Sequence, residues 1–209
     1  MADSGGISIG ADGVPRCWWC DSDDLLRHDH DLEWGRPVGD DQRLFEMLML
    51  EAFMAGLSWL TVLRKRETFR TAFRDFDPRV VARFTARDAA RLMRDPGIVR
   101  NRAKIDATIN NARRIGELVD EFGSFAAYVW SFEPKPRKGL LDRAALMKLT
   151  TSPEATAMSK DLRRRGWAFV GPTTVYSFMQ AMGLVNDHIK GCFAVPEVER
   201  LRRQFVRPQ

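Results

Sequence analysis

The stretch 95–123, DPGIVRNRAKIDATINNARRIGELVDEFG, decides the fold. It joins a predicted helix at 87–95 (RDAARLMRD) to a long amphipathic helix that begins near Arg100. Gly97 lies in the short turn between them, and we expect it to adopt the positive φ that a tight turn needs. The pattern predicts a helix-hairpin-helix.

The second helix of this hairpin begins with a basic segment that carries Arg100, Arg102 and Lys104. The first N–H groups of a helix have no intrahelical partner, and together with the helix dipole they attract phosphate. Such a hairpin would hold a DNA backbone without reading its sequence. The alternative is an ordinary corner between two helices with a solvated basic face.

The rest of the chain also predicts helices. Sustained period-two alternation is absent, and Gly and Pro fall between segments of helical periodicity. Asp40 or Asp41 is expected to cap one helix, and Thr85 followed by Asp88 to cap another. The expected helices cover 40–56, 57–73, 77–84, 85–93, 100–123, 124–132, 152–166 and 173–185, whereas 15–39 and 133–141 look irregular. The sequence therefore predicts an all-α fold of roughly eight helices.

Length and composition set the domain organisation. The 209 residues, 44% of them hydrophobic, suffice for a compact core, and no apolar run approaches the roughly 18 residues of a membrane helix. Residues 1–14 are rich in Gly, Ser and Asp, lack the pattern of a secretory signal, and are expected to form a disordered tail. A helical domain is expected at 15–195 and a basic tail at 196–209.

Charge and cysteine content indicate the compartment and the class of partner. Lys and Arg exceed Asp and Glu by 33 to 28, which gives a net charge of +5. This mild excess is compatible with a phosphate-backbone partner but does not require one. Three cysteines, an odd number, argue against a disulfide scaffold and for a reducing cytoplasm. We expect a monomer that does not associate with membranes.

Near the C-terminus, GLVNDHIKGC (183–192) places His188 and Cys192 four residues apart. On a helix this spacing would point an imidazole and a thiol the same way, as half of a metal site. Two more ligands would have to come from elsewhere in the chain. The alternative is a hydrogen-bonded structural histidine beside a small buried cysteine.

Tryptophans and one carboxylate suggest a pocket. Trp19 lies in an irregular segment, Trp34 in the loop DLEWGRP, and Trp59 just past a predicted helix end. Glu51 lies on an otherwise apolar helix, where a buried carboxylate is costly without a partner. A flipped-out base needs this combination of aromatic faces and an acceptor. The alternative is core tryptophans and an exposed Glu51.

Five segments occur in an order that resembles DNA-3-methyladenine glycosylase I, the bacterial Tag-type family. They are RCWWC (16–20), HDHDLEWGRP (28–37), LFEMLMLEAFMAGLSWLTVLRKRE (44–67), GIVRNRAKI (97–105) and FVGPTTVYSFMQAMGLVNDHIKGC (169–192). The resemblance covers about residues 15–192. It implies an all-helical helix-hairpin-helix glycosylase with a structural zinc, which removes 3-methyladenine from alkylated double-stranded DNA in the bacterial cytoplasm.

The resemblance also implies the zinc ligands, which are Cys17, His30, His188 and Cys192. Two cysteines and two histidines make a closed tetrahedral site, which here would join the N-terminal segment to the C-terminal end. Cys20 forms a C-x2-C pair with Cys17, so Cys20 or His28 in place of His30 stays open as an alternative.

For the base pocket, the resemblance implies Glu51 as the base-contacting carboxylate, Trp59 as the stacking ring, and Trp19 and Trp34 as further pocket aromatics. The family lacks the catalytic Asp that other helix-hairpin-helix glycosylases place after the hairpin, so Glu51 is the expected catalytic residue. Leu57, in the GLSW turn, is a candidate wedge for the gap left by the flipped base.

Three positions depart from the family. Leu26 and Asp29 stand where it carries pocket tyrosines, and Met54 stands where a polar residue is familiar. We expect Asp29 to add a carboxylate to the base-binding set. These changes leave open a repurposed member with altered lesion specificity, such as a bulkier alkylpurine, and a binder of damaged DNA without catalysis. No lysine is marked as a Schiff-base nucleophile, so the expected enzyme is monofunctional.

Overall fold

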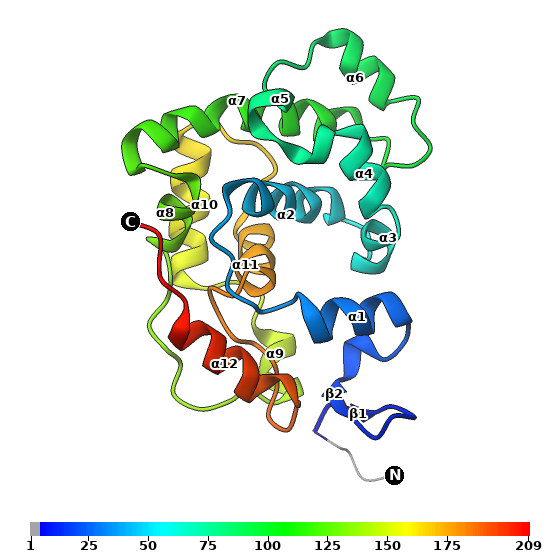
Figure 1. Cartoon of the computed structure of the whole chain (residues 1–209), viewed down its shortest axis with the longest axis vertical. Helices are drawn as coiled ribbons and strands as arrows, with labels where there is room; N and C mark the ends of the chain where they lie inside the picture. The colour runs from blue at the N-terminus through cyan, green and yellow to red at the C-terminus, as the bar shows by residue number, and fades with distance from the viewer. Residues whose placement is uncertain (1–4) are drawn as a thin grey trace.

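The structure, a computed structural model, describes residues 5–209 and is predominantly helical (Figure 1). The helices are α1 (Asp24–Leu32), α2 (Asp41–Met54), α3 (Trp59–Leu63), α4 (Arg66–Ala72), α5 (Pro78–Val81), α6 (Ala86–Leu92), α7 (Arg102–Phe122), α8 (Phe125–Trp130), α9 (Arg143–Lys148), α10 (Pro153–Arg164), α11 (Pro172–Ala181) and α12 (Ala194–Gln204). Two short 3-10 turns, η1 (Trp18–Cys20) and η2 (Arg74–Phe76), and two strands, β1 (Ile7–Ile9) and β2 (Pro15–Cys17), complete the elements. Within the described range, no helix has the length and apolar composition needed to cross a bilayer.

Helix α2 forms the centre of the core. Every residue from Leu44 to Phe53 is buried, and the helix packs against α7, α8 and α11 (Figure 1). Each buried Leu, Phe or Met side chain stabilises the fold by about 1.5–3 kcal/mol. The Asp40 carboxylate accepts a hydrogen bond from the Arg43 amide, which confirms the predicted cap. Glu51 is therefore carried by a helix that is buried along ten consecutive residues.

The predicted hairpin is present as α6, a turn, and α7, with α6 at one extremity of the molecule (Figure 1). Thr85 and Asp88 form the predicted capping box. The expectation of a positive φ at Gly97 is wrong, because its φ lies outside that region. A glycine fits there because a Cβ would lie 2.9 Å from both Asp95 Oδ1 and Thr68 Cβ.

Two further expectations about helices are corrected. The segment 15–39, expected to be irregular, contains η1 and α1, and Asp23 caps α1 by accepting from the Leu25 amide. The single helix expected at 57–73 is two helices, α3 and α4. The break comes at Lys65, whose backbone leaves the helical region and whose ammonium group donates to the Pro96 carbonyl oxygen.

The N-terminal segment is not a disordered tail where the structure describes it. Strand β1 pairs antiparallel with β2, with Ile7 opposite Cys17, and the Trp18 amide donates to the Gly6 carbonyl oxygen at 2.9 Å. The expectation is therefore wrong for residues 5–14, and residues 1–4 lie outside the described range. The pairing of β1 with β2 holds Cys17 in place, and it adds a small two-stranded sheet to the expected all-α fold.

The C-terminal segment is also more ordered than expected, because the predicted boundary at residue 195 falls inside α12. Val198 is fully buried. Arg202 and Arg207 both pair with Glu133, at 3.0 and 2.7 Å, which fastens the chain end to the segment after α8. The basic residues of 196–209 thus partly serve to hold α12 in the fold.

Candidate functional site

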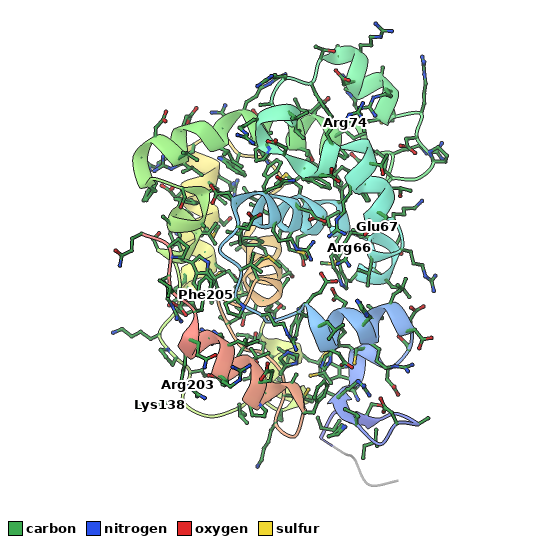
Figure 2. The ribbon with its side chains drawn as sticks, in the orientation of Figure 1. Arg66, Glu67, Arg74, Lys138, Arg203 and Phe205 are labelled. Atoms are coloured by element: carbon green, nitrogen blue, oxygen red, sulfur yellow. The ribbon has the colours of Figure 1, made fainter. Side chains whose placement is uncertain are left out.

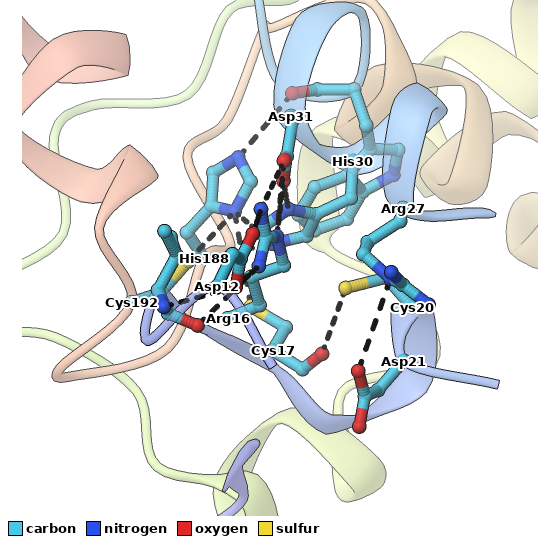
Figure 3. Close-up of polar contacts among 12 residues, drawn as sticks. Asp12, Arg16, Cys17, Cys20, Asp21, Arg27, His30, Asp31, His188 and Cys192 are labelled. Atoms are coloured by element: carbon cyan, nitrogen blue, oxygen red, sulfur yellow. Dashed lines mark hydrogen bonds and ion pairs between the residues drawn. The ribbon is translucent and has the colours of Figure 1, made fainter. Parts of the chain in front are cut away.

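Cys17, His30, His188 and Cys192 come together from three distant parts of the chain, and we call them the four-ligand group (Figure 3). All four are buried, and their ligand atoms lie within 4.8 Å of one another. The two histidine nitrogens are 3.2 Å apart, and three sulfur–nitrogen distances are 3.4, 3.7 and 3.8 Å. A tetrahedron with metal–ligand bonds of 2.0–2.3 Å has edges of roughly 3.3–3.8 Å, so the group fits a zinc ion.

Hydrogen bonds orient both imidazoles toward the centre of the four-ligand group. His30 Nδ1 donates to Asp31 Oδ1 at 2.8 Å, and His188 Nε2 donates to the Trp34 carbonyl oxygen at 3.3 Å, because both acceptors lack a proton. This leaves His30 Nε2 and His188 Nδ1 as ligand atoms. The pKa of the Cys192 thiol is lowered by a hydrogen bond from Cys17 and by the two imidazoles.

Neither alternative ligand lies in this group. Cys20 is buried, but its Sγ points to the Cys17 carbonyl oxygen at 3.1 Å, and His28 is exposed. The expected helical spacing of His188 and Cys192 is wrong, because they lie in the loop between α11 and α12. A turn closed by the Cys192 amide on the Ile189 carbonyl oxygen brings the two side chains together instead.

A cavity of about 320 Å³, which we call the aromatic pocket, opens beside the four-ligand group. Its lining residues are Trp18, Trp19, Trp34, Glu51, Met54, Trp59, Leu146, Met147, Leu149, Ser177 and Gln180. The structure thus brings together the three tryptophans and the carboxylate that the sequence singled out. Trp34 packs edge-on against His188, with centroids 4.7 Å apart, and Trp19 packs similarly against His30 at 5.3 Å. The ligand histidines therefore support one wall of the pocket.

Among the described residues, Glu51 is the only carboxylate in the pocket lining. Its side chain is buried, and Oε2 has no hydrogen-bond partner among the described residues. Burial, and secondarily the nearby Asp29 carboxylate, raise the pKa of Glu51 to about 8. Such a group would gain from a ligand that carries positive charge or a hydrogen-bond donor.

The raised pKa of Glu51 predicts a pH-dependent stability. Since the folded-state pKa lies above the ordinary value of 4.5, this group's contribution is fully present below pH 4.5 and is lost as the pH rises through about 8. Replacing Glu51 by Gln removes that loss. We therefore expect the variant to gain stability over the native protein progressively from pH 5 to pH 8.5, measured by urea unfolding. The exposed control Glu117→Gln should show a constant difference, and a constant difference for Glu51→Gln would contradict the assignment.

The departures Leu26 and Asp29 lie behind the pocket wall. Asp29, expected to contact the base, instead accepts a hydrogen bond from Trp59 Nε1 at 2.9 Å and is only 2% exposed. Burial raises the pKa of Asp29 to about 6, although the hydrogen bond from Trp59 lowers it. Leu26 packs with Cys20 and Leu63. The expectation that Asp29 contacts the base directly is thus not met.

Several lining residues escaped the sequence reasoning. Leu146, Met147 and Leu149 come from α9 and the residue after it, a segment without regular apolar periodicity. Ser177 and Gln180 lie one turn apart on α11, and Gln180 Nε2 donates to Asp187 Oδ2. Two polar residues at this spacing on an otherwise apolar helix were a signal that the sequence contained.

The exposed candidates for DNA contact gather around two turns. Leu57 is 45% exposed in the turn between α2 and α3. Arg100 and Arg102 are exposed at the start of α7, where Arg102 pairs with Asp106 at 2.7 Å. The Asn101 side chain caps α7 by accepting from the Lys104 amide. The earlier amides of this helix start are the ones that a phosphate would use.

Lys104 does not belong to this exposed set. Its side chain is buried, and Nζ donates to the carbonyl oxygens of Phe53 and Ala55, at 2.9 and 2.6 Å. These carbonyls end α2 and otherwise lack helical partners. The expectation that Lys104 holds phosphate is wrong in this structure, because its ammonium group is committed to the protein. Burial also lowers the pKa of Lys104.

The chain is similar in sequence and in structure to one family of known proteins. Residues 19–195 match the family model described as methyladenine glycosylase. DNA-3-methyladenine glycosylase 1 of Escherichia coli K12 is 47% identical over 185 residues, which cover 88% of this chain and 98% of that protein. A crystal structure of 3-methyladenine DNA glycosylase I superposes with a TM-score of 0.78 at 48% identity, covering 85% of this chain and 98% of the other. The Staphylococcus aureus structure that concerns 3-methyladenine recognition gives 0.78 at 41% identity, covering 83% and 92%. The chain belongs to the methyladenine glycosylase family.

Proposed function

We propose that this protein is a monofunctional DNA glycosylase that removes N3-alkylated adenine, foremost 3-methyladenine, from alkylated double-stranded DNA. The observation that carries the proposal is Glu51, a buried carboxylate with an unpartnered oxygen among tryptophans in a cavity of about 320 Å³. Two of the relatives compared above are named for 3-methyladenine glycosylase activity.

The reaction follows from the charge of the substrate. Alkylation at N3 makes adenine cationic within the nucleotide, so the glycosidic bond is already weakened. A base flipped into the aromatic pocket would stack on Trp59, and Glu51 would accept a hydrogen bond from its exocyclic amine. As the bond breaks, its electron pair goes to the base, which leaves neutral, and water adds to C1′ and releases a proton. Glu51 contributes binding of the cationic base, while the lesion itself supplies most of the leaving-group ability.

The protein would hold the DNA around this pocket through two exposed turns. The start of α7 and Arg100 would contact the backbone, and Leu57 would fill the gap that the flipped base leaves. Lys104 already donates to two carbonyl oxygens and so is unavailable for a Schiff base. Its commitment supports hydrolysis without strand cleavage.

Cys17, His30, His188 and Cys192 would hold a structural zinc ion. Four protein ligands close the coordination shell, so the site would supply a crosslink and not a catalytic water. The crosslink would join β2 and α1 to the loop before α12. Its histidines also support Trp34 and Trp19, so the same site would steady one wall of the pocket.

Base release from methylated duplex DNA tests the proposal, with chromatography to identify the freed base. We expect the native protein to release 3-methyladenine and Glu51→Gln to lower kcat/KM by about tenfold or more, because the amide cannot give up a proton and pair as an anion with a cationic base. Glu117→Gln, an exposed change on α7, is the matched control and should match the native rate. Absence of any released base from a folded, zinc-loaded protein would refute the proposal and leave binding of damaged DNA without catalysis.

A second candidate is a wider lesion range that includes bulkier alkylpurines. It is favoured by the aliphatic part of the pocket lining, which includes Met54, Leu146, Met147 and Leu149. These side chains would accommodate an N3 substituent larger than methyl. The same chromatography, run on DNA treated with a longer alkylating agent, decides between the two ranges.

A further inference from the structure

We propose that Asp29 is a positioning residue that fixes the ring of Trp59 in the aromatic pocket through one partly buried hydrogen bond. The proposal rests on the proposed function, since it concerns how the stacking surface for the base is held. Asp29 does not line the pocket and so acts through Trp59 and not on the base directly.

The first observation is the hydrogen bond itself. Trp59 Nε1 donates to Asp29 Oδ2 at 2.9 Å, and Asp29 is 2% exposed. An indole N–H in the interior needs an acceptor, and a charged acceptor makes a stronger bond than a neutral one. The contact therefore selects one orientation of the indole ring.

The second observation is that the other neighbours of Trp59 are apolar, because its side chain packs against the cluster of Cys20, Leu26 and Leu63. It is the first residue of α3, a helix of five residues, and it follows the exposed turn from Ala55 to Ser58. Gly56 in that turn has a φ of 82°. The Ser58 side chain caps the helix start through the Thr61 amide but does not touch the ring. The tether to Asp29 thus restrains the ring from outside α3.

Asp29, in contrast, is firmly held. It lies near the end of α1, where its carbonyl oxygen accepts from the amides of Glu33 and Trp34 at 2.9 and 2.8 Å. Glu33 lies one turn further on the same side and pairs with Arg66 at 2.7 Å, and Arg66 also lies 3.8 Å from the Asp29 carboxylate. Figure 2 shows Arg66 between α4 and α1. Asp29 therefore lies on a packed helix end, which ion pairs with Arg66 of α4 stabilise further.

The consequence concerns base binding. Stacking stabilises a bound base only if the indole face lies parallel to it. Small misplacements of a binding group have large effects on rate. Without the tether the ring would sample other rotamers at the pocket edge. We expect loss of the acceptor to raise KM more than it lowers kcat, with a fall of about tenfold in kcat/KM.

Three variants separate this role from a general effect on the fold. Asp29→Ala removes the acceptor, Asp29→Asn keeps a carbonyl acceptor, and Trp59→Phe keeps a ring but removes the donor. We expect Asp29→Asn to restore kcat/KM to within about threefold of the native value. We expect the Asp29→Ala and Trp59→Phe double variant to lose no more than the worse single variant, because both changes break one interaction. Asp24→Asn, on the exposed side of α1, is the control and should leave the rate unchanged.

A readout independent of activity is the exchange of the Trp59 indole proton in ¹⁵N-labelled protein. We expect slow exchange in the native protein and Asp29→Asn, and fast exchange in Asp29→Ala. The proposal is overturned if Asp29→Ala leaves the exchange unchanged, or if the two single effects multiply in the double variant. If the native protein releases no base while the indole proton is protected by Asp29, the proposed function fails and the tether stands.

Discussion

Replacing Cys192 by Ala is expected to abolish stoichiometric zinc binding and to lower the melting temperature by about 10–20 °C. The four-ligand group joins Cys17 in β2 to Cys192 in the loop before α12, so it closes most of the chain into one loop. Crosslinks over more than 100 residues stabilise by roughly 4–5 kcal/mol. In a protein of this size, 1 kcal/mol corresponds to about 2–4 °C.

Calorimetry with metal analysis on the same samples measures both effects. Cys20→Ala is the matched control, because Cys20 is equally buried but its Sγ donates to the Cys17 carbonyl oxygen and is not one of the four ligand atoms. It should keep one zinc per chain and lose only a few degrees. A Cys192→Ala protein that still binds one zinc, or that melts within about 3 °C of the native protein, would show that the site does not bind metal in the way proposed.

Loss of a bound metal ion should also disturb the wall of the aromatic pocket. Trp34 and Trp19 pack edge-on against His188 and His30 of the four-ligand group. Trp59 Nε1 donates to Asp29, the residue next to His30. Helix α1 thus contributes His30 of the four-ligand group and the Asp29 acceptor for Trp59 from adjacent positions. This one short helix is therefore the physical link between the four-ligand group and the aromatic pocket.

Local signals in the sequence predicted the elements that local interactions determine. The capping box at Thr85 and the cap at Asp40 depend on residues three positions apart, and both are confirmed. The long helix α7 follows from its amphipathic period. The family resemblance supplied the four candidate ligands, which form two pairs more than 150 residues apart in sequence that no periodicity could have brought together.

Elements that depend on tertiary contacts were missed. Helix α1 is nine residues with only three leucines, and it is held by the contacts of Asp29 and His30 with distant segments. Helix α9 has no buried residue, so its sequence has no apolar stripe from which a helix could be predicted. The tail expected at 196–209 is helical as far as Gln204, and Glu133 pairs with two of its arginines, Arg202 and Arg207. In each case the partner that decides the structure lies far away in the sequence.

The sequence position of Lys104 suggested the wrong environment for its side chain. Replacing this residue is the second change for which we expect a large effect. A lysine in the first turn after a hairpin suggests a phosphate contact, yet its ammonium group is buried against the end of α2. The last carbonyls of a helix lack partners, and a cation there is favourable for the helix dipole. Lys104 therefore caps the helix that carries Glu51, and it ties that helix to the start of α7.

Replacing Lys104 by Met keeps the length of the side chain but leaves the Phe53 and Ala55 carbonyls without their donor. Hydrogen bonds from a charged donor are worth about 1.5–3 kcal/mol each, so we expect a loss of about 3–5 kcal/mol in the free energy of unfolding. Because these carbonyls follow Glu51 by two and four residues, base release should fall with stability. Urea unfolding and the excision assay at a temperature where both proteins are folded measure the two effects.

Arg100→Met is the contrasting variant, because Arg100 is exposed on the same hairpin. It should leave stability nearly unchanged but weaken DNA binding and lower the slope of log K against log salt by about 0.9, the value for one phosphate contact. Lys104→Met should do the opposite, with stability lost and the salt slope retained. If Lys104→Met proved as stable as the native protein and lowered the salt slope, its ammonium group would turn to phosphate in the complex, and the helix-capping role assigned here would be refuted.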